Sequence, residues 1–360
     1  MSWLATLQST SPAGGVAIVM LLALAIYALL GGADYGAGVW DLLARGPREA
    51  AQRELIAHAI GPVWEANHVW LIVVIVLLFT AFPPAFSAIM TTLHVPLSLM
   101  LIGVVLRGSA FTFRSYDDSE MGEHRWNRAF SIPSVVTPML LGMVVGAIAT
   151  GEPGRAAAAA EAGQPVPLLS TWLRPFPVVV GVFTLNIFAF LAAVYLTLET
   201  PDRDLREDFR RRALAAALSL GAVAWIVYLV ARAEAPIVFR GLDASAWGTP
   251  VRVATGAFAV ATIAALWARR YHVARVAAMV QVALILWGCA LAEYPLLVPP
   301  DISIESAAAP PIVHKLLLIA LGIGSVVLIP SIVYLFRIFK GHTFYLSRDR
   351  ATREDAGRGG

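Results

Sequence analysis

Two acidic residues stand at the edges of long apolar stretches, where a charge is costly. Asp34 closes the apolar run 13–33, and Glu65 comes just before the apolar run 66–83. A charged side chain within hydrocarbon costs ~2.5–3.5 kcal/mol on insertion scales, so each acid is a candidate functional group. Burial disfavours the charged form of a carboxyl group, which lets such a group carry a proton near neutral pH. The two acids are therefore candidates for proton uptake.

His68 follows Glu65 by three residues and so lies on the same face of a helix. Histidine titrates near neutrality and can relay a proton. Structural alternatives remain open: Glu65 can cap a helix N-terminus, and Asp34 can face water beside a Gly32–Gly36 packing face. Glu65 and His68 also match half of a di-iron pattern. No span carries a second copy, so we expect no metal site.

Arg107 closes the third apolar run, 85–106. A basic residue there is either an interfacial anchor or the counter-charge of an acid, a quinone or a lipid headgroup. Trp64 and Trp70, on either side of the acidic motif, are interfacial or packing residues.

His94 lies about the middle of that third run, just before Pro96. It is a candidate haem ligand, but a haem with two histidine ligands needs a partner on another helix. The other histidines fall in loops or at the ends of spans. A buried histidine satisfied by hydrogen bonds is the favoured interpretation.

The elements that carry these residues are membrane helices. Of the 360 residues, 58% are hydrophobic and only 14% are charged, whereas soluble domains carry about 25% charged residues. The high hydrophobic fraction and the low charged fraction exclude soluble enzymes and nucleic-acid-binding proteins, and we expect no nucleic-acid partner. A spanning helix needs about 20 apolar residues. Nine continuous runs predict an all-α polytopic protein with nine transmembrane helices, at 13–33, 66–83, 85–106, 130–150, 176–198, 213–231, 251–268, 273–292 and 312–336.

Basic residues predict the orientation. Of the 27 Lys and Arg residues, 21 lie in five segments on one side of a nine-span chain: 45–54, 107–128, 203–212, 269–275 and 337–360. The positive-inside rule then places the N-terminus outside and the C-terminus in the cytoplasm. We expect one integral membrane domain, 1–346, and a frayed cytoplasmic tail, 347–360.

Two motifs resemble subunit II of the cytochrome bd-type quinol oxidases, including the cyanide-insensitive branch. They read GGADYGAG at 31–38 and PVWEANHVWL at 62–71. The family's first motif has an acid where this chain has Gly31. Arg107, the stretch 113–115 and Arg125-Trp126 also resemble the connection after the third helix.

The resemblance implies two four-helix bundles plus one extra helix, in a bacterial inner membrane. It implies a complex that oxidises quinol, reduces dioxygen to water and takes up protons from the cytoplasm. Haems b and d would be held by the partner, subunit I, and none by side chains of this chain. A structural quinone or lipid and a small single-span subunit are also compatible with the family.

In this light, Asp34, Glu65 and His68 are proton-path candidates. Trp64, Asn67, Trp70 and Arg107 are candidates for lining that path or the subunit contact. No residue of this chain is expected to be catalytic by itself.

Two other functions remain open. A proton-coupled secondary transporter would need discontinuous helices and a midplane substrate site. A haem-binding membrane cytochrome would need His94 as a ligand.

Overall fold

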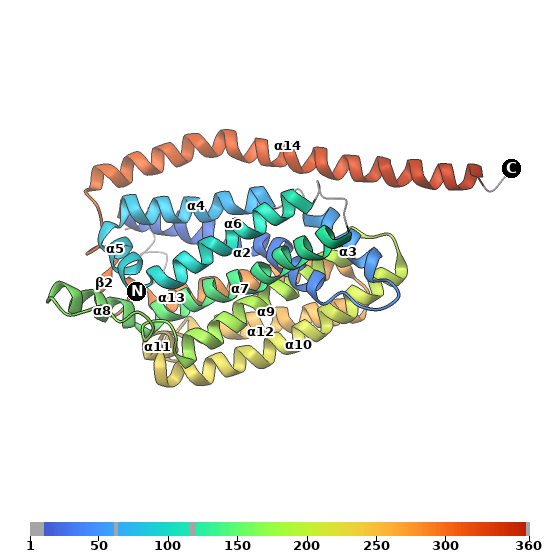
Figure 1. Cartoon of the computed structure of the whole chain (residues 1–360). Helices are drawn as coiled ribbons and strands as arrows, with labels where there is room; N and C mark the ends of the chain where they lie inside the picture. Colours follow the sequence, from blue (N-terminus) through green and yellow to red (C-terminus); the bar gives the residue numbers. More distant parts are fainter. Residues whose placement is uncertain (1–10, 61–63, 115–119, 358–360) are drawn as a thin grey trace.

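The structure is a computed structural model that describes residues 11–60, 64–114 and 120–357. Long helices lie side by side along one direction (Figure 1). They are α2 (Pro12–Leu42), α4 (Trp64–Ala81), α6 (His94–Arg114), α7 (Glu120–Thr150), α9 (Pro175–Glu199), α10 (Arg203–Glu234), α12 (Gly248–Trp267), α13 (Tyr271–Glu293) and α14 (Pro311–Gly357). The predicted all-α class is confirmed.

Short elements cover the two ends of these helices (Figure 1). One end holds α5 (Pro83–Thr92), α8 (Glu152–Glu161), α11 (Pro236–Ala244) and a small hairpin of antiparallel strands, β1 (Leu296–Val298) and β2 (Ile302–Ser303). The opposite end holds α3 (Glu49–Ile60).

The count of spans differs from the nine apolar runs. Among the described residues, 7 helices are long and apolar enough to cross a membrane, or up to 8 if α4 and α5 form one bent span. The predicted run 85–106 is not one helix, because it is divided between α5 and α6. His94–Ala110, within α6, is a shorter apolar helix. Nine spans therefore remain a prediction.

A pair of prolines causes the bend of 117° between α4 and α5. Pro83 and Pro84 cannot continue α4, and the residue before a proline avoids helical backbone angles. Phe82 accordingly has φ −135° and ψ 60°. The carbonyl of Ala81 accepts hydrogen bonds from the backbone N–H of Ala309 (2.9 Å) and from Nε2 of His314 (3.1 Å). The break thus leaves that buried acceptor satisfied, as a low-dielectric interior requires.

Helix α2 lies at the centre, against α7 and α9. Glycines allow this close approach: a Cβ on Gly36 would collide with the backbone carbonyl of Phe188 in α9, and one on Gly38 with the side chain of Ser134 in α7. Nε1 of Trp40 donates to the carbonyl of Ala189 at 2.7 Å. The glycine-rich end of α2 is therefore the most tightly enclosed part of the helix.

Helix α14 runs along one edge, beside α4 (Figure 1). It contacts α2 and α4 and keeps exposed apolar side chains such as Leu316, Ile323 and Val326. The helix continues to Gly357, and the frayed cytoplasmic tail at 347–360 stays a prediction.

Candidate functional site

Asp34 and Arg107 form a buried ion pair between α2 and α6. Oδ1 of Asp34 lies 2.5 Å from Nη1 of Arg107, and the two side chains are 0% and 2% exposed. Nη2 of Arg107 donates to the backbone carbonyl of Asp34 (2.9 Å), and its Nε donates to Oγ of Ser134 in α7 (2.8 Å). One guanidinium group thus joins three helices.

Aromatic rings enclose the cation. The guanidinium carbon lies 4.7 Å from the ring centroid of Tyr35 and 4.7 Å from that of Phe130. Ring faces attract a desolvated cation. The charge of Arg107 is therefore compensated by one carboxylate and two rings, which offsets part of the cost of removing it from water.

Asn67 extends the cluster to α4. Its Nδ2 donates to Oδ2 of Asp34 at 3.3 Å, and the side chain is fully buried. Its Oδ1 is buried without a hydrogen-bond partner in the described structure. The residues Asp34, Arg107, Ser134 and Asn67 are called the charged cluster below.

A second set of polar groups continues from the charged cluster. The Tyr35 hydroxyl lies 3.2 Å from Nε2 of His68, so one of the two groups donates to the other. Tyr27 lies two turns earlier on α2 and is also buried. His68, Tyr35 and Tyr27 are called the hydroxyl chain below. Groups that both donate and accept are suited to passing a proton along a hydrogen-bonded line.

Asp41 is a second buried acid on α2. It follows Asp34 by seven residues, which returns it to the same helix face. Its side chain is 0% exposed; Oδ2 accepts from Oγ of Ser131 (2.9 Å) and lies 3.5 Å from Nη1 of Arg53. Its Oδ1 is buried and has no hydrogen-bond partner in the described structure. The seven-residue spacing could have identified Asp41 from the sequence.

The structure brings four of the predicted site residues together: Asp34, Asn67, His68 and Arg107. Trp70 is partly buried and packs against the central core. The backbone of Trp64 and Glu65 opens α4, but their side chains lie outside the described residues. Gly31 packs against the ring of Phe188, in the space that the family's acid would need.

The expected place of His94 within a span is wrong. His94 is the first residue of α6, beside the break after α5, and its side chain is exposed. Nδ1 lies 3.0 Å from the carbonyl of Thr91. The helix begins here because Pro96 fits the first turn of a helix and not its interior. The described residues hold no group of three or more His, Cys, Asp or Glu residues that could bind a metal ion.

Comparisons with known proteins agree with this arrangement of helices. The chain matches the family model of cytochrome bd terminal oxidase subunit II over residues 15–339. Its fold is that of a chain in the structure of bd oxidase from Geobacillus thermodenitrificans, with a TM-score of 0.75, 23% identity, and coverage of 91% of this chain and 98% of that one.

Curated relatives match over shorter stretches. Cytochrome bd-I ubiquinol oxidase subunit 2 of Escherichia coli K12 is 26% identical over 179 residues, which cover 48% of this chain and 45% of that protein. Cytochrome bd ubiquinol oxidase subunit 2 of Bacillus subtilis is 32% identical over 124 residues, or 34% and 36% of the two chains. The matched stretches thus span less than half of these relatives.

The apolar helices and the family match together indicate a multi-pass bacterial membrane protein. Because the family match covers most of its length, the chain belongs to the cytochrome bd terminal oxidase subunit II family.

Proposed function

We propose that this chain is the accessory subunit of a terminal oxidase whose haem-bearing subunit I oxidises quinol and reduces dioxygen to water. Family membership supports this role. Haems b and d would supply the oxygen chemistry and would be held by the partner.

The charged cluster beside the hydroxyl chain is the observation that carries a role in proton delivery. Reducing dioxygen consumes two protons for each water formed, so a slow route limits turnover. The ion pair of Asp34 and Arg107 joins α2 to α6, and its hydrogen bonds with Asn67 and Ser134 join both helices to α4 and α7. That arrangement positions Nε2 of His68 against the hydroxyl of Tyr35.

In this proposal, the fixed ion pair orients the route and the neighbouring groups carry the proton. Glu65 collects a proton near the cytoplasmic end of α4 and passes it to His68. Tyr35 accepts a proton at its hydroxyl oxygen and donates its own onward. Asn67, Trp64 and Trp70 line the route or the contact with subunit I.

Asp41 extends the route toward the cytoplasm. Seven residues of helix separate it from Asp34, which is about 10 Å along the axis. Its neighbour Arg53 is 24% exposed, so this acid is one side chain away from water. We therefore propose Asp41 as a second acid, beside Glu65, that takes up protons from the cytoplasm for this route.

The finer topology follows from the same proposal. Counting α4 with α5 as one span, and His94–Ala110 as another, gives nine. With nine spans, the basic segments place the N-terminus outside and the C-terminus in the cytoplasm. Two four-helix bundles plus α14 as the extra helix would then make up the subunit.

The break between α4 and α5 is the kind of discontinuity that a transporter uses. The Ala81 carbonyl at this break, however, already accepts hydrogen bonds from Ala309 and His314. The break therefore offers no support for the transporter alternative.

The test uses the purified complex with Glu65→Gln and, separately, Glu65→Asp. Glutamine cannot carry a proton, so oxygen consumption and proton uptake should fall together, while aspartate should retain most of both rates. An unchanged haem spectrum shows that the complex has assembled. If both variants keep wild-type rates, Glu65 only caps α4 and its role in proton delivery is wrong.

A further inference from the structure

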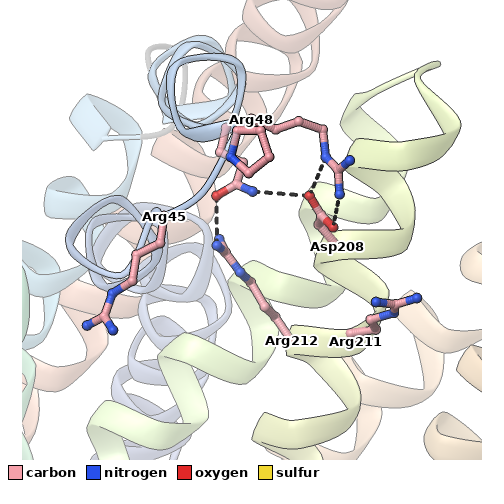
Figure 2. Close-up of a pocket in the computed structure, with 7 residues that line it drawn as sticks. Arg45, Arg48, Asp208, Arg211 and Arg212 are labelled. Carbon is pink, nitrogen blue, oxygen red and sulfur yellow. Dashed lines mark hydrogen bonds and ion pairs between the residues drawn. The ribbon is translucent and has the colours of Figure 1, made fainter.

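A cavity of about 280 Å³ lies where α3 meets the beginning of α10. Four arginines line it, together with Gln52 and Asp208: Arg45, Arg48, Arg211 and Arg212. Figure 2 shows Arg45 and Asp208 at opposite sides of this space, with Arg212 rising between them. The cavity is therefore a concave surface of strongly basic composition.

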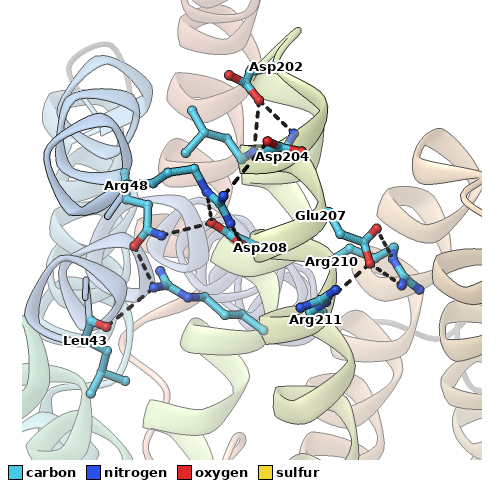
Figure 3. Close-up of polar contacts among 11 residues, drawn as sticks. Leu43, Arg48, Asp202, Asp204, Glu207, Asp208, Arg210 and Arg211 are labelled. Atoms are coloured by element: carbon cyan, nitrogen blue, oxygen red, sulfur yellow. Dashed lines mark hydrogen bonds and ion pairs between the residues drawn. The ribbon is translucent and has the colours of Figure 1, made fainter. Parts of the chain in front are cut away.

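Two of its arginines lack an acidic partner. Arg48 is held by Asp208 through two hydrogen bonds of 2.8 and 2.7 Å, and Nε of Arg211 lies 3.4 Å from Oε1 of Glu207 (Figure 3). Arg45 and Arg212, in contrast, have no carboxylate within 4 Å among the described residues. Asp208 is shared by Arg48 and, through Gln52, by Arg212, so the four arginines outnumber the carboxylates around the cavity, which suits one phosphate group.

The lining is also held in place. Oε1 of Gln52 accepts from Nη2 of Arg212 at 2.7 Å, while Nε2 of the same Gln52 donates to Asp208 at 3.1 Å. The Arg212 guanidinium stacks near the rings of Trp40 and Phe209. Its Nη1 is buried and makes no hydrogen bond in the described structure. Packing and the bond to Gln52 thus fix the Arg212 guanidinium beside the cavity.

An apolar surface continues from the cavity along α10. Leu218 and Trp225 follow Arg211 at seven-residue intervals, so the three lie on one face of the helix. Leu218 is 67% exposed and Trp225 is 62% exposed. The stripe extends about 21 Å from Arg211 to Trp225, compared with about 15 Å for half of the hydrocarbon layer. A dissolved phosphate ion would use the cavity alone, whereas a phospholipid would use both surfaces.

We propose that this cavity binds the phosphate headgroup of an anionic phospholipid, with its acyl chains along the exposed face of α10. The lipid would bridge α3 and α10 at the membrane surface. Basic pockets between membrane helices recognise lipid headgroups in this way. The inference does not depend on the proposed proton route.

Native mass spectrometry of the purified whole complex measures how much phospholipid it retains. A second experiment measures the thermal stability of the complex after phosphatidylglycerol, phosphatidylcholine or inorganic phosphate is added. The variants are Arg45→Gln and the double substitution Arg45→Gln with Arg212→Gln. Arg270→Gln is the matched control, since Arg270 is an exposed arginine outside the cavity.

The wild type and the control should retain anionic lipid and be stabilised by phosphatidylglycerol but not by phosphatidylcholine. Retention should fall about fivefold for each arginine removed. Arg45 is exposed and outside the packed core, so its single variant decides the question even if the double variant does not fold. Equal retention by Arg45→Gln and wild type would overturn the proposal. Equal stabilisation by inorganic phosphate and phosphatidylglycerol would show a site for free phosphate instead.

Discussion

At the scale of single residues, Asp34 and Arg107 depend on each other. Both are buried, and each is the other's only opposite charge within 4 Å among the described residues. Removing one member of a buried pair leaves an uncompensated charge, which typically costs about 3–5 kcal/mol. The pair is therefore as important for folding as for any proton chemistry.

Arg107→Met should destabilise the complex by about 3–5 kcal/mol, because Asp34 would lose its counter-charge. Arg107→Lys should destabilise the complex less than Arg107→Met, since lysine keeps the positive charge, although it loses the hydrogen bonds to Ser134 and the Asp34 carbonyl. Thermal unfolding in detergent, followed by size-exclusion chromatography, measures both. Wild-type stability for Arg107→Met would show that the pair is not formed in the complex.

Asp41→Asn tests the buried acid that lies seven residues after Asp34 on α2. Asparagine has nearly the same shape and can keep the bond from Ser131, so the fold should be retained. Proton uptake should slow by about tenfold, which corresponds to 1.36 kcal/mol of added barrier. A pH-indicator assay of the purified complex measures the rate. Asp204→Asn, at a side chain that is 78% exposed, is the control and should leave the rate unchanged.

At the scale of elements, the closeness of α2 to α9 and α7 positions the charged cluster. Gly36 and Gly38 lie in the two turns after Asp34, and each permits contact with a neighbouring helix. A larger residue at position 36 would push α2 away from α9, and one at position 38 would displace Ser134, which bonds to Arg107.

Gly36→Ala should destabilise the protein by about 1–3 kcal/mol, the usual effect of overpacking, because its Cβ meets the carbonyl of Phe188. Gly256→Ala in α12 is the matched control, since a Cβ there meets nothing within 4 Å. Alanine favours a helix over glycine, so the control should be neutral or slightly more stable. The melting temperatures of both variants decide the comparison. Equal effects would contradict the close contact of α2 with α9.

Glu152, at the start of α8, predicts a pH dependence at the other end of the molecule. Burial acts to raise the pKa of Glu152, but hydrogen bonds and charges from Arg155 and Arg174 outweigh it and hold the pKa below its ordinary value of 4.5. A folded-state pKa below the unfolded one contributes stability that is complete above 4.5 and is lost as pH falls through the folded value.

The melting temperature should accordingly decrease as acid is added below pH 4.5, and Glu152→Gln should show a shallower decrease over that range. Thermal unfolding at a series of pH values measures the slope. If the melting temperature changes equally with pH in both proteins, Glu152 is not a source of the pH dependence.

At the scale of the whole molecule, the sequence predicted the helical class and most of the charged cluster. Asp34 and Arg107 were recognisable because charges are rare at the ends of apolar runs. Ser134 and Tyr27 carried no such signal, since serine and tyrosine are ordinary in membrane helices. Their roles depend on which helices become neighbours, and hydropathy does not report that.

The division of the run 85–106 was also missed, although its signals are present. Pro83 and Pro84 mark the start of α5, and Pro96 lies in the first turn of α6. The boundary between the runs 66–83 and 85–106 matches the first of these breaks, whereas continuous hydropathy concealed the break at Leu93, because both short helices beside it are apolar. The expectation that His94 lies in the middle of a spanning helix was wrong for the same reason.

The proposed proton route through the hydroxyl chain is tested most directly by Tyr35→Phe. The substitution keeps the ring beside Arg107 and removes only the hydroxyl that faces His68. Proton uptake is followed in a single turnover, after dioxygen is mixed with the fully reduced complex. We expect uptake to slow by about tenfold, while the haem spectrum stays unchanged and stability falls by about 1 kcal/mol. Proton uptake at the wild-type rate would contradict the account.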